Sequence, residues 1–293
     1  FLSGRFHSHR HRIFYSLLVF KYAPMYGIQI AFRRFNPTLG ITGSPWVGLT
    51  YFKQFFESYY FTDILWNTIS LSVFTMLIGF PVPILLALLI NEIKNVKFKK
   101  LIQNITYIPN FLSVVVIVSM LTLFSNSDYG LFNKITGLFG IAPMDFMSKP
   151  ALFQPLYVFS NVWQFMGFNA IIYIAALSSV DQELYEAASI DGATRLQKII
   201  HISIPCIMST IIVLFIMRIG SLMSVGFEKV YLMQNSVTLS ASEVISTFIY
   251  KNGIQKGQFS YSTAVGLFNS VINFVLLISA NFASKKLTKT SLW

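Results

Sequence analysis

Charge and cysteine are both scarce in this sequence. Only 11% of the 293 residues are charged, against about 25% in ordinary soluble domains, whereas 54% are hydrophobic. This composition argues against a water-soluble globule, and it excludes disorder, which requires low hydrophobicity and high charge density. A single cysteine, Cys206, excludes an internal disulfide framework and a thiolate metal cluster. The many aromatic residues, with 29 Phe and 14 Tyr, then point to a polytopic membrane protein.

Basic residues outnumber acidic ones, and the formal net charge is +11. In a soluble protein this excess would suggest a nucleic-acid partner. In a membrane protein, excess Lys and Arg usually mark cytoplasmic loops, so we predict no nucleic-acid partner. His7, His9 and His11 form a local cluster, but no carboxylate or cysteine accompanies them, so no metal site is predicted. Because the chain begins at Phe1 rather than Met, we expect further residues to precede it.

Long apolar runs dominate the chain, and a membrane-spanning helix needs about 20 such residues. Six runs bounded by charged or turn residues cover about residues 13–32, 64–90, 104–124, 154–178, 206–226 and 263–284. Gly79, Pro81 and Pro83 lie where the long second run would kink. We therefore predict an all-α polytopic membrane protein in which residues 1–293 form a single transmembrane domain with six helices.

The distribution of Lys and Arg over alternate connections indicates the orientation. Short connections of one set carry Arg5, Arg10, Arg12, Lys94, Lys97, Lys99, Lys100, Arg195, Lys198, Lys285, Lys286 and Lys289. Longer loops of the other set carry Arg33, Arg34, Lys53, Lys134, Lys149, Lys229, Lys251 and Lys256. Because basic residues concentrate on the cytoplasmic side, both termini are predicted to be cytoplasmic.

Two cations lie inside predicted spans and are not explained by this topology. Lys21, in the first run, can extend its ammonium to the headgroups. Arg218 lies deep in the fifth run and needs a carboxylate, helix carbonyls or an anionic ligand. We expect Arg218 to face the helix bundle, where it either organises a gate or binds an acidic ligand.

The segment between the fourth and fifth runs, 181–205, reads DQELYEAASIDGATRLQKIIHISIP. It holds four of the eleven acidic residues, so it cannot lie in hydrocarbon. Its pattern predicts a short helix over 182–190, a break at Asp191 and Gly192, and a second short helix before Pro205. Two short helices joined at a glycine suit docking in a groove on another protein. The alternative is an amphipathic element lying among the lipid headgroups.

The run EAASIDGATRLQKIIHISIP resembles the EAA loop of ABC importer permeases. Its pattern is carried here by Glu186, Ala187, Ala188, Gly192, Ile204 and Pro205, with Asp191 directly before the glycine. Four further stretches resemble the branch that imports complex oligosaccharides and polysaccharide fragments. They are FKYAPMYGIQIAF at 20–32, GSPWVGLTYF at 43–52, LALLINEIKN at 86–95 and QFSYSTAVGLFNSVINF at 258–274.

This resemblance implies a type I ABC importer permease fold and a set of partners. The chain would pair with a second permease subunit as a heterodimer, dock two cytoplasmic ATPase subunits and receive a sugar from an extracellular solute-binding protein. Glu186 would meet the ATPase, and Gly192 would be the hinge of the coupling element. The sequence has no G-x-x-x-x-G-K-[ST] phosphate loop, so ATP and Mg²⁺ are expected on the partner ATPase. We predict a transport subunit of the bacterial cytoplasmic membrane and no enzyme activity in this chain.

Polar residues within the runs are the candidates for a substrate path, because they are costly in lipid. Asn161, Gln164 and Phe168 lie near one another on the fourth run, and Tyr107 belongs to a weaker cluster on the third. Amides beside aromatic faces suit sugars, which present hydroxyl edges and apolar C–H faces. The last run carries a second polar stripe, which lines the path or mediates helix packing; its members are Ser262, Gly266, Asn269 and Asn273.

Other classes of membrane protein fit parts of this pattern. An ion-coupled secondary transporter should show repeated halves and midplane carboxylates, and no acidic residue lies in mid-span. A membrane-embedded enzyme needs convergent His, Asp or Ser residues inside spans, but all four histidines, including His201, fall in predicted cytoplasmic segments. A permease of another ABC importer branch, for amino acids or peptides, remains an alternative.

Overall fold

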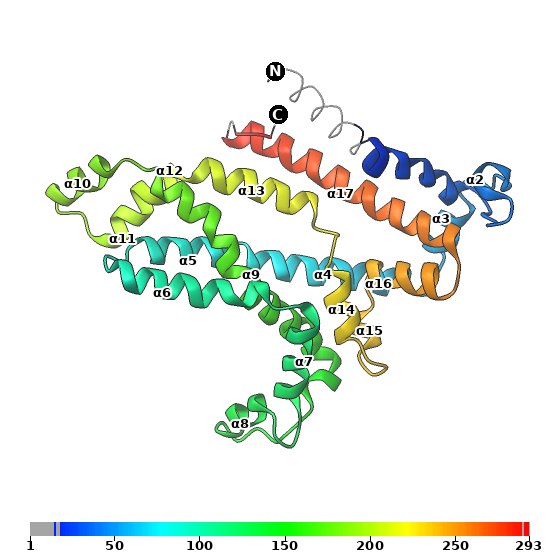
Figure 1. The fold of residues 1–293 in the computed structure, drawn as a ribbon, viewed down its shortest axis with the longest axis horizontal. Coiled ribbons are helices and arrows are strands. Elements are labelled where there is room, and N and C mark those ends of the chain that lie inside the picture. The colour runs from blue at the N-terminus through cyan, green and yellow to red at the C-terminus, as the bar shows by residue number, and fades with distance from the viewer. Residues whose placement is uncertain (1–14, 16–17, 289, 293) are drawn as a thin grey trace, which may run out of the picture. The chain divides into compact units, whose positions relative to one another are not determined.

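The computed structural model describes residue 15, residues 18–288 and residues 290–292, and the regular elements within them are helices (Figure 1). Two compact units make up the chain. One comprises Phe1–Thr62 and Ile245–Val271, and the other Asp63–Val244 and Ile272–Trp293. Both α4 (Phe61–Gly79) and α17 (Phe259–Thr288) cross the unit boundaries. Each unit is described below by itself.

The smaller unit is organised around one phenylalanine. Phe55 is 1% exposed, and the rings of Phe61, Phe248 and Phe268 lie 5.1, 6.1 and 5.6 Å from it between centroids. Such contacts between aromatic rings hold together segments that are far apart in the sequence. Apart from its shares of α4 and α17, its elements are η1 (Leu18–Tyr22), η2 (Ala23–Phe32), α2 (Gly40–Gly43), α3 (Thr50–Phe56), α16 (Ile245–Tyr250) and η6 (Lys251–Gln255).

The larger unit contains most of the long helices. In chain order, the first elements of this unit, long and short, are α4, α5 (Pro81–Asn91), α6 (Val96–Tyr107), η3 (Ile108–Phe111), α7 (Val114–Ser125), α8 (Leu131–Gly137), η4 (Phe146–Ser148) and α9 (Pro150–Ser178). They are followed by α10 (Gln182–Ile190), α11 (Arg195–Lys198), η5 (Ile199–Ser203), α12 (Ile204–Cys206), α13 (Met208–Gly220), α14 (Phe227–Met233), α15 (Leu239–Ser242) and the C-terminal part of α17.

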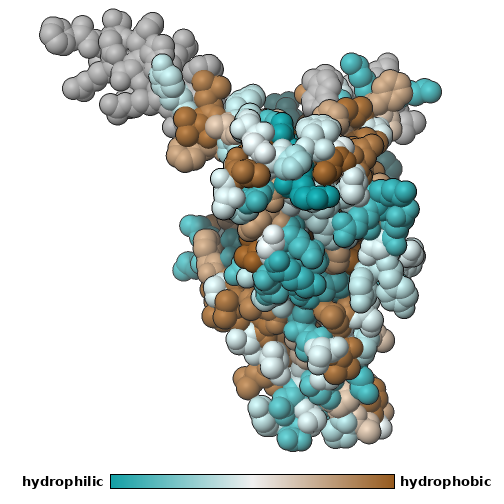
Figure 2. Space-filling view, turned by 90° about the vertical axis from the view of Figure 1, so that its right-hand side faces the viewer, coloured by the Kyte–Doolittle hydropathy of each residue, from teal (hydrophilic) through white to brown (hydrophobic). Residues whose placement is uncertain are grey.

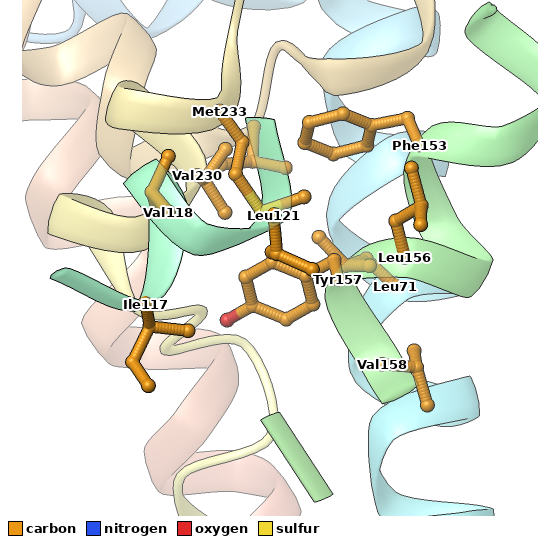
Figure 3. Packing of buried hydrophobic residues seen from close by; sticks show 11 residues of the cluster. Leu71, Ile117, Val118, Leu121, Phe153, Leu156, Tyr157, Val158, Val230 and Met233 are labelled. Atoms are coloured by element: carbon orange, nitrogen blue, oxygen red, sulfur yellow. The ribbon is translucent and has the colours of Figure 1, made fainter. Parts of the chain in front are cut away.

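Helix α9 is central to the larger unit, because α5, α6, α7, α13 and α15 all pack against it. Gly167 permits the close approach of α6, since a Cβ there would collide with the carbonyl group of Thr106. At its N-terminal end, α9 contributes Phe153, Leu156 and Tyr157 to a buried cluster with residues of α4, α7 and α14 (Figure 3). Close packing therefore fixes the helices that surround α9.

Five of the six apolar runs coincide with helices that could cross a membrane. Three helices satisfy the length and hydropathy requirements alone, namely Phe61–Asn91, Pro150–Ser178 and Phe259–Lys286. Two bent pairs satisfy them together: Val96–Phe111 with Val114–Ser125, bent by 98°, and Arg195–Cys206 with Met208–Gly220, bent by 63°. The first run falls partly outside the described residues and over η1 and η2, so that span remains a prediction.

The bends have identifiable local causes. Pro109 lies in the first turn of the short helix η3, and the side chain of Ser113 then caps a new helix by accepting a hydrogen bond from the Val116 backbone N–H. The run 206–226 is interrupted at both ends, because α13 begins at Met208 and ends at Gly220. Residues 221–226 are turns and irregular backbone, where the sequence predicted helix.

Large apolar side chains remain exposed along the helices of the larger unit. Trp66, Leu77, Leu85 and Leu89 are 57–66% exposed on α4 and α5. Brown, hydrophobic residues likewise reach the surface in the view of Figure 2. Exposed apolar faces on long helices are expected where lipid or another transmembrane subunit covers them.

Candidate functional site

A cavity lined by polar residues lies beside α9 within the larger unit. Asn161, Phe165, Asn169 and Ile172 follow one another at i, i+4, i+8 and i+11, so they share one face of this helix. Two recesses of about 330 and 150 Å³ meet along it, and both are lined by Asn161, Phe165, Asn169 and Arg218. The larger recess is also lined by Ser72, Thr75, Tyr157, Ser221, Leu222, Ser224, Val225 and Gly226.

Arg218 supplies the positive charge of this cavity. It belongs to the last turns of α13, its side chain is exposed, and it lines both recesses. No ion pair joins Arg218 to a carboxylate among the described residues. A guanidinium with free donors on the wall of a recess is suited to bind a carboxylate, with two parallel hydrogen bonds.

The amides of Asn161 and Asn169 complement this charge. Neither side chain makes a hydrogen bond to another described residue, although both line the two recesses. Each amide offers donors and an acceptor, the combination that sugar hydroxyls require. The ring of Phe165 lies on the same wall and offers an apolar face. The cavity therefore has groups for charged, polar and apolar parts of a saccharide.

The predicted path residues of the fourth run separate in the structure. Asn161 lines the cavity, as the sequence led us to expect. Gln164 is instead 2% exposed, and its side chain donates to the Leu112 carbonyl oxygen at 3.3 Å. Phe168 is 46% exposed and meets the edge of Phe111, with ring centroids 6.4 Å apart. Gln164 and Phe168 do not line either recess, and neither does Tyr107 on α6.

The polar stripe of the last run mainly serves helix packing. In the smaller unit, the Ser262 side chain lies 3.0 Å from where a Cβ on Gly253 would be, and Gly266 faces Ile249. Asn269 lies in the same unit, and its Oδ1 is buried without a partner among the described residues. In the larger unit, Asn273 accepts from the Met223 N–H at 2.9 Å and donates to the Ser224 hydroxyl at 3.1 Å. Asn273 thereby holds the 221–224 turn that lines the cavity.

Sequence reasoning missed several lining residues. Asn169 could have been predicted from the sequence, because it lies eight residues after Asn161 on the same helical face. Tyr157 carried no such signal, since its ring is buried in the apolar cluster of Figure 3 while the residue also lines the larger recess. Ser221 and Ser224 line the cavity because the helix ends at Gly220, a break that the apolar run concealed.

Lys229 is the most unexpected residue of this region. The sequence assigned it to an outer loop, but its side chain is enclosed and the residue is 4% exposed. Its ammonium donates to the Gln164 Oε1 at 3.3 Å and lies 5.8 Å from the centre of the Tyr157 ring. Burial lowers the pKa of Lys229 from 10.5 to about 8, because the charged form loses its hydration.

The predicted coupling segment, 181–205, has the first helix and the glycine turn that its sequence indicated. Its second helix does not end before Pro205 as predicted, because α11, η5 (Ile199–Ser203) and α12 continue as one helical run to Cys206. Helix α10 covers Gln182–Ile190, which confirms the predicted helix, and the Asp181 side chain caps it by accepting from the Glu183 N–H. Gly192 follows with a φ of +77°, a conformation that glycine adopts without steric cost. Thr194 and Gln197 form a reciprocal capping box at the start of α11.

Two side-chain contacts fix the segment internally and to the helices behind it. The Lys198 ammonium donates to the Ser189 hydroxyl at 2.6 Å and ties α11 to α10. The hydroxyls of Tyr185 and Ser203 are 2.9 Å apart, and Ser203 is 1% exposed. Tyr185 also packs against a buried cluster that includes Tyr173, Leu177 and Ile207. These contacts join α10 to α9 and to the segment that precedes α13.

The opposite face of the coupling segment is uncovered. Glu186, Ala187, Asp191 and Gly192 are exposed, and Ile190 is 87% exposed. Of the other members of the motif, Ala188 and Ile204 are half-buried and Pro205 is exposed. An apolar side chain at the tip of a polar protrusion is typical of a docking element rather than of a solvated loop.

The basic residues and the histidine cluster near the start of the chain are not described by the structure. His7, His9 and His11, with Arg5, Arg10 and Arg12, lie outside the described residues. Within residues 15, 18–288 and 290–292, no group of three or more His, Cys, Asp or Glu side chains could hold a metal ion.

Comparison with known proteins places this geometry in context. Residues 65–289 match the family model of binding-protein-dependent transport system inner membrane components. Protein LplB of Bacillus subtilis is 44% identical over 94% of this chain and 87% of its own length. The polygalacturonan/rhamnogalacturonan transport system permease protein YteP of the same organism is 45% identical over 92% of this chain and 84% of its own.

Solved structures show the same fold. A chain in the crystal structure of a bacterial ABC transporter involved in import of the acidic polysaccharide alginate matches with a TM-score of 0.90. It is 37% identical, and the match covers 97% of this chain and 96% of that chain. The alginate transporter in complex with an alginate pentasaccharide-bound periplasmic protein matches equally well, with a TM-score of 0.90. The chain is therefore a member of the family of binding-protein-dependent transport system inner membrane components, with the fold of an ABC importer permease.

Proposed function

We propose that this permease subunit forms half of the path through which an ATP-driven importer moves acidic oligosaccharides or polysaccharide fragments. The observation that carries the proposal is the unneutralised Arg218 beside the free amides of Asn161 and Asn169. The names of the relatives support the substrate class, since they include permeases for polygalacturonan and for arabinooligosaccharides. The alginate importer adds a second acidic polysaccharide.

Arg218 would bind the carboxylate of a sugar unit while neighbouring groups bind the rest of the ring. A charged guanidinium in a recess walled by protein interacts more strongly with a carboxylate than it would in water. Asn161 and Asn169 would exchange hydrogen bonds with hydroxyls, and Phe165 would pack on a C–H face. Moderate affinity suits a transport path, because the sugar must leave the site as well as enter it.

The proposed assembly follows from the resemblance and from the coupling segment. We place six spans in this chain, both termini in the cytoplasm, and the coupling segment on that same side. A second, different permease subunit would complete the path, two ATPase subunits would bind ATP and Mg²⁺, and an extracellular solute-binding protein would deliver the sugar. The periplasmic protein bound to the alginate importer supports this last partner.

In this assembly the coupling segment would convert closure of the ATPase subunits into a change of access. Glu186 and the exposed Ile190 would contact the ATPase, and Gly192 would set the angle between α10 and α11. Because the segment connects α9 to α13, its displacement moves both helices that supply the cavity's amides and its arginine. ATP binding would thus shift the population toward the outward-open state.

Direct sugar binding to the purified complex tests the proposed substrate class without the solute-binding protein. A tetragalacturonide is compared with the same tetrasaccharide after its carboxyl groups are reduced to alcohols. Arg218→Gln should weaken binding of the acidic sugar by about tenfold or more, because a charge-assisted hydrogen bond is lost. Binding of the reduced sugar should be unchanged.

Matched variants separate this effect from general damage to the complex. Arg218→Lys keeps the charge and should retain part of the preference, whereas Arg34→Gln removes an arginine that does not line the cavity. Equal losses for both sugars in Arg218→Gln, or no loss for either, would refute a role for Arg218 in carboxylate recognition. Co-purification of the ATPase confirms that each variant assembles.

A further inference from the structure

Lys229 lies between the wall of the larger recess and the buried apolar cluster of the larger unit. It belongs to α14, which follows directly after the 221–226 segment that lines the larger recess. Val230 and Met233 of the same helix are 0% and 1% exposed, within the cluster of Figure 3. Tyr157 connects the two places, because its ring lies under the ammonium while the residue also lines the recess.

The ammonium of Lys229 is poorly satisfied in this enclosed position. It has three N–H donors, yet one hydrogen-bond acceptor, Gln164 Oε1, lies within reach among the described residues, at 3.3 Å. No carboxylate of the described chain pairs with it, and the adjacent Glu228 is exposed. Burying a charge without a counter-ion costs free energy, and the ring of Tyr157 offsets part of that cost.

Gln164 links this lysine to the bend of the third span. Its amide nitrogen donates to the Leu112 carbonyl oxygen, which lies between η3 and α7, while its carbonyl oxygen accepts from Lys229. Both hydrogen bonds are 3.3 Å long, at the weak end of the usual range. One glutamine on α9 therefore connects α14 to the 98° bend by two weak contacts.

From this geometry we infer that Lys229 is a positioning residue whose enclosed charge makes the closed state of the cavity's outer side only marginally stable. Gln164 acts as a latch, because the hydrogen bond that it accepts from the ammonium allows this closed state to form. The inference rests on the proposed transport function and topology, in which α14 lies on the outer side. When α14 separates from α9, the ammonium regains water and the cost of enclosing it disappears. A methionine at this position would pack without that cost and would favour the closed state.

The inference predicts changes of opposite sign for two neighbouring residues. Gln164→Leu removes the acceptor and leaves the enclosed ammonium with the Tyr157 ring alone, so the outer side should open more often. Lys229→Met removes the charge itself, so the outer side should open less often than in the wild type. In the double variant the missing acceptor no longer matters, and opening should resemble that of Lys229→Met.

Cysteine labelling in right-side-out membrane vesicles measures this opening in the assembled importer, without sugar. Cys206→Ser removes the native thiol, and Ser221→Cys places a reporter in the larger recess. The rate of reaction with a membrane-impermeant maleimide then reports how often the recess opens outward. We expect about a tenfold higher rate for Gln164→Leu, and a rate below wild type for both Lys229→Met and the double variant.

Replacement of a second glutamine of α9 is the control that distinguishes loss of the latch from general loosening of the helix packing. Gln154→Leu removes another glutamine of α9, one that donates to the Ser70 hydroxyl at 2.6 Å and has no contact with Lys229. It should leave the rate within about twofold of wild type. If Lys229→Met fails to co-purify with the ATPase, Lys229→Gln, which also removes the charge, is measured in its place.

Three results would overturn the inference. If Gln164→Leu and Lys229→Met change the rate in the same direction, or if neither changes it, Lys229 is an ordinary structural residue. An additive double variant would have the same meaning, because the two residues would then act independently. Since no sugar is present, these results do not depend on Arg218 or on the identity of the transported saccharide.

Discussion

The coupling segment and the cavity are built in different ways, although they share helices. The coupling segment is contiguous in sequence, and its caps, its glycine turn and its Lys198–Ser189 contact lie within eighteen residues of one another, from Asp181 to Lys198. The cavity draws its walls from α4, α5, α9, α13 and the 221–226 turn. Local hydrogen bonds determine the first region, whereas packing between distant helices determines the second.

This difference suits the roles proposed for the two regions. A docking element must keep one shape while it moves, and capped short helices on a glycine turn provide that shape. A transport path must change shape, and contacts between helices can be exchanged as whole surfaces. The coupling segment lies between α9 and α13 in the chain, so in the proposed mechanism it would act directly on the helices of the cavity.

The largest effect is expected where a glycine allows α6 to meet α9, the helix that supplies the cavity's amides. Gly167→Val would place a branched side chain against the Thr106 backbone, and a backbone atom cannot move aside as a flexible side chain can. We expect the variant to lose its folded state, with almost no monodisperse complex recovered in size-exclusion chromatography. Gly137→Val is the control, because a Cβ there has open space around it. Normal recovery of Gly167→Val would show that α6 and α9 do not need this close contact.

The next largest effect concerns the turn of the coupling segment. Gly192→Pro is incompatible with a φ of +77°, because proline holds φ near −65°. ATP hydrolysis stimulated by the solute-binding protein should fall by about tenfold or more, a loss equivalent to about 1.4 kcal/mol of coupling, while sugar binding to the cavity stays unchanged. Gly192→Asn, which tolerates this conformation better, should retain most of the stimulation. Stimulation at the wild-type rate in Gly192→Pro, or in Glu186→Ala, would refute the coupling role.

The sequence predicted the coupling segment well because its determinants are local. Asp191 and Gly192 break the first helix by their own chemistry, without reference to distant residues. Pro205 was less informative, because the second helical run continues through it to Cys206. The apolar runs likewise located the long helices, since span length depends on composition alone. The end of α13 at Gly220 was not predictable in this way, because the residues after it are also apolar and the turn is held by Asn273 from α17.

The cavity was only partly predictable, for a geometric reason. A polar residue in a span must face protein or water, but this rule does not distinguish a recess from an internal hydrogen bond. Asn161 lines the recess, whereas Gln164, three residues later, bonds to Leu112 and Lys229. Lys229 was counted as a charge of an outer loop, and the packing of α14 against α7 and the N-terminal part of α9 explains its burial. These assignments depend on tertiary contacts that no local pattern encodes.

A moderate effect should appear in the pH dependence of stability. The pKa of Lys229 is about 8 in the folded protein and 10.5 when exposed, so between these values the unfolded state binds more protons. Stability of the wild type should therefore rise with pH from 8 to 10.5 relative to Lys229→Met, by at most about 3 kcal/mol. Thermal unfolding of both purified complexes across this window measures the difference. A constant difference across the window would indicate that burial does not lower the pKa of Lys229.

The smallest effect should come from the contact that joins the two regions. Tyr185→Phe keeps the ring that packs near Tyr173 and Leu177 but removes the hydroxyl that lies 2.9 Å from the Ser203 hydroxyl. Because Ser203 is enclosed, its hydroxyl would lose a partner, at a cost of about 1 kcal/mol. If this bond transmits displacement of α10 to the helices behind it, transport per ATP hydrolysed should fall severalfold while basal hydrolysis is retained. Ser203→Ala should give the same ratio, and the double variant should add nothing to it, because both substitutions remove one shared contact. An unchanged ratio in all three variants would mean that packing of the ring alone couples the segment to the cavity.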